Sequence, residues 1–130
     1  MMRLALALAI LLAAPAGAET RMTADDFDAF ATGKTLTYRS ASGVFGTEEY
    51  LPGRKVRWSD GSAGCYSGLW YPKGEDICFY YQGVDEPACW RFLRTDDKVI
   101  ADFSGDAETL FLDVVASKDK LPCNGLKANE

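Results

Sequence analysis

The sequence contains no histidine among its 130 residues. This absence removes the commonest general base, the usual ligand of a catalytic metal ion and the Ser-His-Asp triad. The four cysteines include no C-x-x-C pair of the kind that redox proteins use, and they are too widely spaced for a four-thiolate zinc site. We therefore predict no metal-binding residues, no cofactor-binding residues and no cofactor.

Positive charge is also scarce, with 14 basic against 19 acidic side chains and a formal net charge of −5. The one basic cluster is Arg54-Lys55-Val56-Arg57, and on a strand its charges should alternate outward into solvent. Phosphate binding needs a clustered basic surface, so we expect no nucleic-acid partner.

Arrangements of carboxylates and serines that would support catalysis are missing as well. Glu48 and Glu49 are adjacent on a predicted strand, so they should point to opposite faces and cannot act as a close pair. A pair from separate strands, such as Glu49 with Asp113, is geometrically possible but unspecific. The run Gly61-Ser62-Ala63-Gly64 lacks the strand–helix context of a nucleophile elbow. We predict no catalytic residues and a protein that is not an enzyme.

The first 18 residues have the layout of a secretory signal peptide. Met1-Met2-Arg3 is a short positive start, Leu4 to Leu12 is apolar, and an A-x-A site ends at Ala18. The apolar run is far shorter than the ~20 residues that span a bilayer. We predict cleavage after Ala18, a periplasmic or secreted location, no membrane span after cleavage, and a single β-rich domain over residues 19–130.

A short helix is predicted to open this domain. Thr23 and Asp26 form a capping box, while Met22 and Phe27 stand at the positions of a hydrophobic staple. Gly33 is placed to end the helix in a left-handed conformation.

From residue 34 onward, apolar and polar residues alternate or form short aromatic runs, which indicates strands. Turn residues separate these runs and no helical segment intervenes, which is typical of an antiparallel meander. About eight strands would allow closure into a small barrel, and a strongly curved open sheet is the alternative. The predicted strands are Thr35 to Arg39, Val44 to Leu51, Lys55 to Ser59, Tyr66 to Tyr71, Ile77 to Gln82, Ala88 to Arg94, Val99 to Phe103 and Leu110 to Val115.

The stretch from Cys65 to Phe92 holds three of the four cysteines. In an oxidising compartment two disulfides are the default, and four cysteines allow three connectivities. A hairpin centred on Gly83-Val84 places Cys78 directly across from Cys89 and gathers Ile77, Phe79, Trp90 and Phe92 on the other face. This register favours a Cys78–Cys89 disulfide and leaves Cys65 for Cys123.

The aromatic residues have two interpretations. They could line a ligand cavity, as barrels of about eight strands can, or fill the interior of a small sheet protein, which we favour. On the face away from the predicted core, Tyr80 with Arg91 is a pointer to a surface contact. The aromatic residues in question are Tyr38, Tyr50, Trp58, Tyr66, Trp70, Tyr71, Tyr80, Tyr81 and Trp90.

An ordered set of motifs resembles a family of small exported, uncharacterised proteins of alphaproteobacteria with a G-x-E-x-Y…W…C-x-x-G-x-W-Y…I-C-F…C-W-x-F pattern. The resemblance covers most of the residues after the leader, and it implies export and disulfides but no catalytic activity. Periplasmic lysozyme inhibitors are another group of small disulfide-bearing barrels, but Ser62 to Tyr66 departs from their S-G-x-x-Y loop in order and spacing. The motifs here are Gly46 to Trp58, Cys65 with Gly68 to Tyr71, Ile77 to Phe79, Cys89 to Phe92 and Leu121 to Gly125.

These observations favour a non-enzymatic periplasmic binding or interaction module on a rigid β scaffold, with an unknown protein or small ligand as its partner. A second hypothesis is an inhibitor of a cell-envelope hydrolase that acts through a loop such as Ser59–Gly64. A third is an enzyme with carboxylate chemistry, which would need two carboxylates meeting in a pocket.

Overall fold

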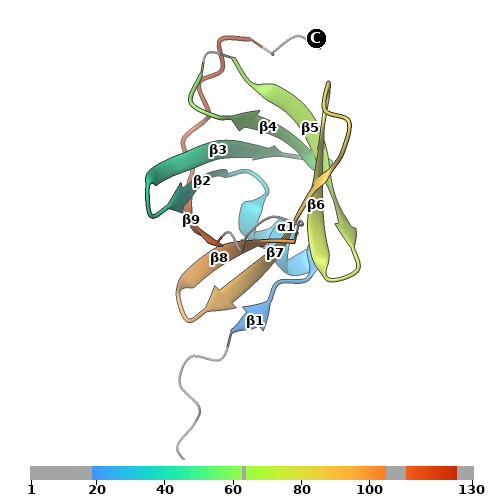
Figure 1. Cartoon of the computed structure of the whole chain (residues 1–130), viewed down its shortest axis with the longest axis vertical. Helices are drawn as coiled ribbons and strands as arrows, with labels where there is room; N and C mark the ends of the chain where they lie inside the picture. The colour runs from blue at the N-terminus through green and yellow to red at the C-terminus, as the bar shows by residue number, and fades with distance from the viewer. Residues whose placement is uncertain (1–18, 63, 105–110, 126–130) are drawn as a thin grey trace, which may run out of the picture.

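The protein is a closed antiparallel β-barrel in a computed structural model that describes residues 19–62, 64–104 and 111–125 (Figure 1). Each strand from β2 to β9 pairs with the next one in the chain, and β9 pairs back with β2 to close the barrel. The strands are β1 (Thr20–Arg21), β2 (Thr35–Ser40), β3 (Gly43–Leu51), β4 (Lys55–Ser59), β5 (Tyr66–Lys73), β6 (Asp76–Tyr81), β7 (Ala88–Thr95), β8 (Lys98–Phe103) and β9 (Phe111–Ser117).

The predicted eight-stranded meander is confirmed, and closure into a barrel rather than an open sheet is now shown. Two details differ from the prediction. Strand β5 continues through Pro72, which was predicted to lie in a turn, and β1 was not predicted. The predicted signal peptide and Leu110 lie outside the described residues.

Strand β1 extends the barrel wall where β6 and β7 diverge. These two strands share only three paired positions, from Ile77↔Trp90 to Phe79↔Ala88. Farther along β7, Thr20 and Arg21 pair with Arg94 and Leu93, and the Met22 amide donates to the Phe92 carbonyl at 2.8 Å. The short strand thus satisfies backbone groups that the divergence would leave open.

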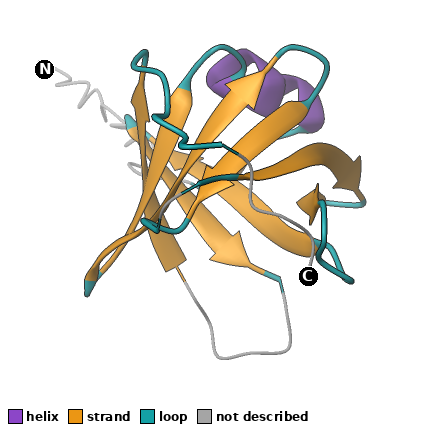
Figure 2. Cartoon of the chain, turned by 90° about the horizontal axis from the view of Figure 1, so that it is seen from above, coloured by secondary structure: helices purple, strands orange, loops and turns teal. Residues whose placement is uncertain are grey.

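Helix α1 (Ala24–Ala31) lies against one edge of the strand framework (Figure 2). The predicted capping box is present, because Thr23 accepts from the Asp26 amide and Asp26 accepts from the Thr23 amide. Gly33 has the predicted left-handed conformation, with φ of 82°. The apolar face of the helix directs Phe27 inward, where its ring is fully buried.

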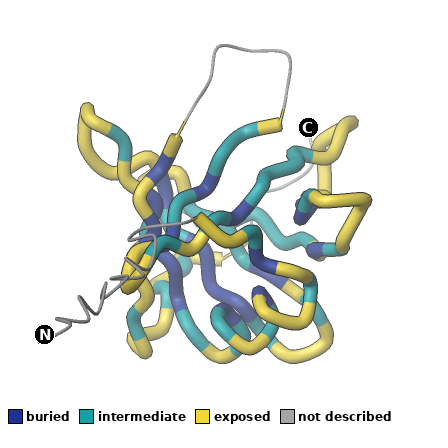
Figure 3. The backbone as a smooth tube through the Cα atoms, turned by 90° about the horizontal axis from the view of Figure 1, so that it is seen from below, coloured by how far each residue is buried: buried dark blue, intermediate teal, exposed yellow. Residues whose placement is uncertain are grey.

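Phe27 is the centre of the core on this side of the barrel. Its ring lies within 4.3 to 6.3 Å of four others, centroid to centroid. Such aromatic pairs stabilise beyond the area that they bury. Figure 3 shows the buried segments gathered in the middle of the molecule and the exposed segments mainly at the turns. The four partner rings belong to Tyr50, Trp70, Phe79 and Phe92.

Both predicted disulfides are present, Cys78–Cys89 and Cys65–Cys123. The hairpin register is also the predicted one, with Ile77 opposite Trp90 and Cys78 opposite Cys89. The second disulfide secures the C-terminal tail to the residue before β5, and the Cys65 amide donates to the Gly125 carbonyl at 2.9 Å.

The basic cluster differs from the predicted row of solvated charges. Arg54 lies in the β3–β4 turn with φ of 59°, and its guanidinium sits 4.5 Å from the Trp70 ring centroid. Arg57 is ion-paired with Glu49, while Lys55 is exposed as predicted. The sequence analysis treated the whole cluster as strand residues, but Arg54 belongs to the turn that precedes β4.

Candidate functional site

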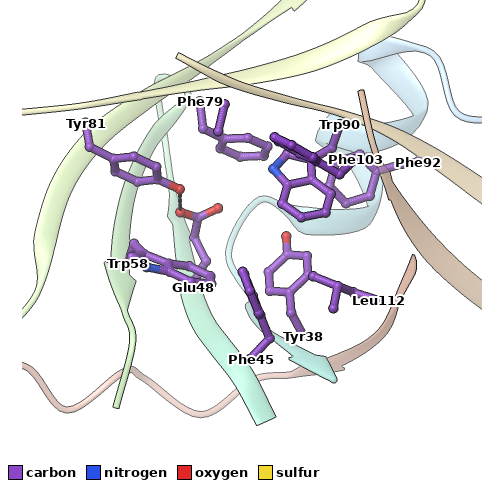
Figure 4. Close-up of a pocket in the computed structure, with 11 residues that line it drawn as sticks. Tyr38, Phe45, Glu48, Trp58, Phe79, Tyr81, Trp90, Phe92, Phe103 and Leu112 are labelled. Carbon is purple, nitrogen blue, oxygen red and sulfur yellow. Dashed lines mark hydrogen bonds between the residues drawn. The ribbon is translucent and has the colours of Figure 1, made fainter. Parts of the chain in front are cut away.

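An aromatic cavity of about 370 Å³ opens into the barrel interior (Figure 4). Alternate residues of a strand face the same side, so the inward positions of most strands contribute to it. Eight of its 11 lining residues are aromatic. The cavity is lined by Tyr38, Phe45, Glu48, Trp58, Phe79, Tyr81, Ala88, Trp90, Phe92, Phe103 and Leu112.

The cavity has a buried floor and a partly exposed rim. Phe79 and Phe92 also contact Phe27, so these two rings separate the helix-side core from the cavity. At the rim, Phe45 is 43% exposed and Trp90 is half-buried. A ligand would therefore enter past aromatic side chains and reach a floor that is shielded from water.

Phe45 reaches the cavity because of a β-bulge. Tyr38 pairs with Gly46 and Arg39 pairs with Val44, which leaves Phe45 as the extra residue of β3. The bulge changes the alternation, so that Phe45 faces the interior together with Glu48. A Cβ at Gly46 would lie 2.1 Å from the Trp58 ring, so glycine here lets that ring pack against the strand.

Glu48 is the only acidic side chain among the described residues that line the cavity, and it is 2% exposed. It accepts a hydrogen bond from the Tyr50 hydroxyl at 2.7 Å and another from the Tyr81 hydroxyl. The Tyr38 and Tyr50 hydroxyls are also hydrogen-bonded to each other. Three tyrosines from three strands thus orient one carboxyl group.

The protonation of Glu48 is set mainly by burial. Desolvation disfavours the carboxylate and raises the pKa of Glu48 to about 7, although the hydrogen bonds from Tyr81 and Tyr50 act in the opposite direction. Burial followed by the nearby Glu48 charge raises the pKa of Tyr38, Tyr50 and Tyr81, so all three remain protonated donors. Glu48 can therefore change charge near neutral pH inside an apolar cavity.

Glu49 has a different environment on the outer side of the barrel. Its carboxylate is ion-paired with Arg57 and accepts from the Leu121 amide at 3.0 Å. It thus holds the C-terminal tail against β3. The two glutamates do face opposite sides, as predicted, and the suggested pairing of Glu49 with the exposed Asp113 does not occur.

The nine aromatic residues singled out in the sequence divide into three groups. Four line the cavity, whereas we favoured an interior that such residues simply fill. Tyr50 and Trp70 belong to the buried core, and Tyr66, Tyr71 and Tyr80 are partly or largely exposed. The four cavity residues are Tyr38, Trp58, Tyr81 and Trp90.

Sequence reasoning did not identify the other seven lining residues as cavity residues, and it assigned two of them, Phe79 and Phe92, to the core alone. The seven are Phe45, Glu48, Phe79, Ala88, Phe92, Phe103 and Leu112. For Glu48 a signal existed, because it stands two residues before Tyr50 on the same face of one strand. The glycine inside the predicted strand was the signal for the bulge that turns Phe45 inward.

Two surface features that the sequence analysis singled out give weaker evidence for a binding site than the cavity does. Tyr80 is 47% exposed and pairs with the exposed Leu69, but Arg91 lies near Glu75 and Asp76 instead. In the loop Ser59–Gly64, whose Ala63 lies outside the described residues, Asp60 accepts hydrogen bonds from Ser62.

Within residues 19–62, 64–104 and 111–125, no three potential metal-ligating side chains cluster, and no helix is long and apolar enough to cross a membrane. No protein-family model, curated protein or solved structure matches the chain. The cavity geometry is therefore the basis for the functional argument.

Proposed function

We propose that the protein is an exported, non-enzymatic binding module that holds one small, largely apolar molecule inside its barrel. The observation that carries this proposal is the aromatic cavity of about 370 Å³, which is within the size range of small-molecule sites. Such sites are mainly apolar, with a few polar groups that orient the ligand, and Glu48 with its tyrosines supplies such groups.

The scaffold favours a preformed site. Closure of β2 on β9 removes a free sheet edge from the wall, and two disulfides connect distant parts of it. A rigid site loses little conformational entropy when a ligand binds. Export and a periplasmic or secreted location, expected from the leader, agree with the two disulfides.

The test is binding of the neutral apolar dye N-phenyl-1-naphthylamine, followed by dye emission and by quenching of Trp58 and Trp90. We expect saturable binding of one dye per chain. Ala88→Phe should abolish it, because Ala88 lines the cavity and a phenyl ring would occupy the space. Ala41→Phe is the matched control, since Ala41 lies in the exposed turn between β2 and β3. Equal binding by both variants, or no saturable binding by the folded wild-type protein, would contradict the proposal.

A further inference from the structure

The ionisable charge that lines the cavity is of one sign, negative. Glu48 lines it, while no lysine or arginine is among its described lining residues. The arginine of the neighbouring strand β4, Arg57, is ion-paired with Glu49 on the outer side. No ion pair involves Glu48 in the part of the chain that the structure describes. An anionic ligand would meet a carboxyl group without a compensating cation, so it is disfavoured.

The hydrogen bonds of Glu48 leave room for a further contact. A carboxylate has two oxygens and about four lone-pair sites. Tyr50 donates to one oxygen and Tyr81 to the other. The titratable groups facing the carboxyl are therefore tyrosine hydroxyls from β2, β3 and β6, and the facing residue of β4 is the uncharged Trp58. Figure 4 shows the carboxyl group projecting among the aromatic rings.

The rings form a connected wall around this group. Centroid distances are 5.9 Å for Tyr38–Trp58, 5.9 Å for Phe45–Trp58, 6.3 Å for Phe45–Trp90 and 4.8 Å for Trp90–Phe103. The faces of tryptophan, tyrosine and phenylalanine attract cations, and the attraction is stronger where water is excluded. Aromatic faces around a single carboxylate match an ammonium group that carries apolar substituents.

We infer that the ligand of this cavity is a small organic cation, an alkylated ammonium whose substituents contact the aromatic wall and whose charge is balanced by Glu48. The inference rests on the proposed function and specifies the chemical class of its ligand. A quaternary ammonium would use the rings and the carboxylate charge alone, whereas a protonated amine would also donate to Glu48.

The test compares two pairs of probes that share shape but differ in charge. Choline is paired with the neutral 3,3-dimethylbutan-1-ol, and phenyltrimethylammonium with the neutral tert-butylbenzene. Affinities are measured at pH 8 by tryptophan fluorescence and calorimetry. In at least one pair we expect the cation to bind about 10-fold or more tightly than its neutral partner, as expected for a desolvated cation site.

A pH series tests the role of the carboxyl without any substitution. With the pKa of Glu48 near 7, a cation that binds the ionised form alone should lose up to about 100-fold in affinity from pH 8 to pH 5. The neutral probes should show no such loss. Glu48→Gln keeps the shape of the side chain and should remove both the preference for the cation and its pH dependence. Glu49→Gln, on the outer side of the same strand, should retain both.

The outcomes separate this inference from the proposed function. If the naphthylamine dye binds but each neutral probe binds as well as its cation, the inference is wrong and the binding function stands. If neither the dye nor any probe binds, both are wrong. If Glu48→Gln binds the dye normally and still prefers the cations, Glu48 does not supply the counter-charge and the inference is overturned.

Discussion

Replacement of Glu48 by glutamine should change how the stability of the protein depends on pH. Burial raises the pKa of this carboxyl from 4.5 to about 7 in the folded protein. Between these two pH values the folded protein retains the proton and the unfolded chain has lost it. Raising the pH through this window therefore favours unfolding, and the stabilising effect of the proton is fully present only below pH 4.5.

The shift corresponds to roughly 3 kcal/mol in the free energy of unfolding, because one pKa unit is worth about 1.4 kcal/mol. Glutamine does not titrate, so Glu48→Gln should lack this loss. We expect the free energy of unfolding of Glu48→Gln, relative to wild type, to rise by about 3 kcal/mol from pH 4.5 to pH 8.

The assay is urea denaturation at pH 4.5, 6 and 8 with both disulfides intact, followed by tryptophan fluorescence. Comparison of the two proteins at each pH cancels the groups that they share. Glu49→Gln removes the same formal charge but breaks an ion pair with Arg57, so it should destabilise the protein at pH 8. A difference between Glu48→Gln and wild type that does not vary with pH would refute the buried-carboxyl reasoning.

Three further substitutions test the fold around the cavity. Phe27→Ala removes a fully buried ring and should lower the free energy of unfolding, measured by urea denaturation, by about 3–5 kcal/mol. A loss below about 1 kcal/mol would contradict the conclusion that Phe27 is the centre of the core. Gly46→Ala should displace the Trp58 ring at a cost of about 1–3 kcal/mol and shift the tryptophan emission, whereas an unchanged spectrum and dye affinity would count against that contact. The double change Cys65→Ser with Cys123→Ser should lower the free energy of unfolding of the protein by up to about 4 kcal/mol. It should change the dye affinity by no more than about two-fold, because this disulfide holds the C-terminal tail and neither cysteine lines the cavity. Loss of dye binding by the folded double variant would show that the tail supports the site.

Much of the fold was predictable from the sequence because strand structure has a period of two. Alternation located the eight barrel strands, and the same period placed Cys78 opposite Cys89 and so identified the hairpin disulfide. The assignment of Cys65 to Cys123 then followed by elimination. Capping chemistry is equally local, which is why Thr23 and Asp26 predicted the start of the helix correctly.

The cavity was not predictable in the same way. Periodicity says which side chains face inward, but it does not say whether their volumes fill the space between the walls. The inward rings of Phe79 and Phe92 pack tightly against Phe27, whereas those nearer the rim leave about 370 Å³ open. The bulge at Phe45 added a second difficulty, since one extra residue reverses the alternation that the prediction follows.

The pairing of β2 with β9 has a consequence for how the barrel is assembled. It pairs residues 35–39 with residues 113–117, so the wall is completed by β9, the last strand of the described residues. Before β9 has formed, β2 and β8 each have an edge of unpaired backbone groups, and such edges can pair with strands of other chains. The Cys78–Cys89 hairpin is local and needs none of these partners, whereas the Cys65–Cys123 bond involves the tail beyond β9. The order of the strands therefore makes β9, residues 111–117, the condition both for closing the barrel and for covering the edges of β2 and β8.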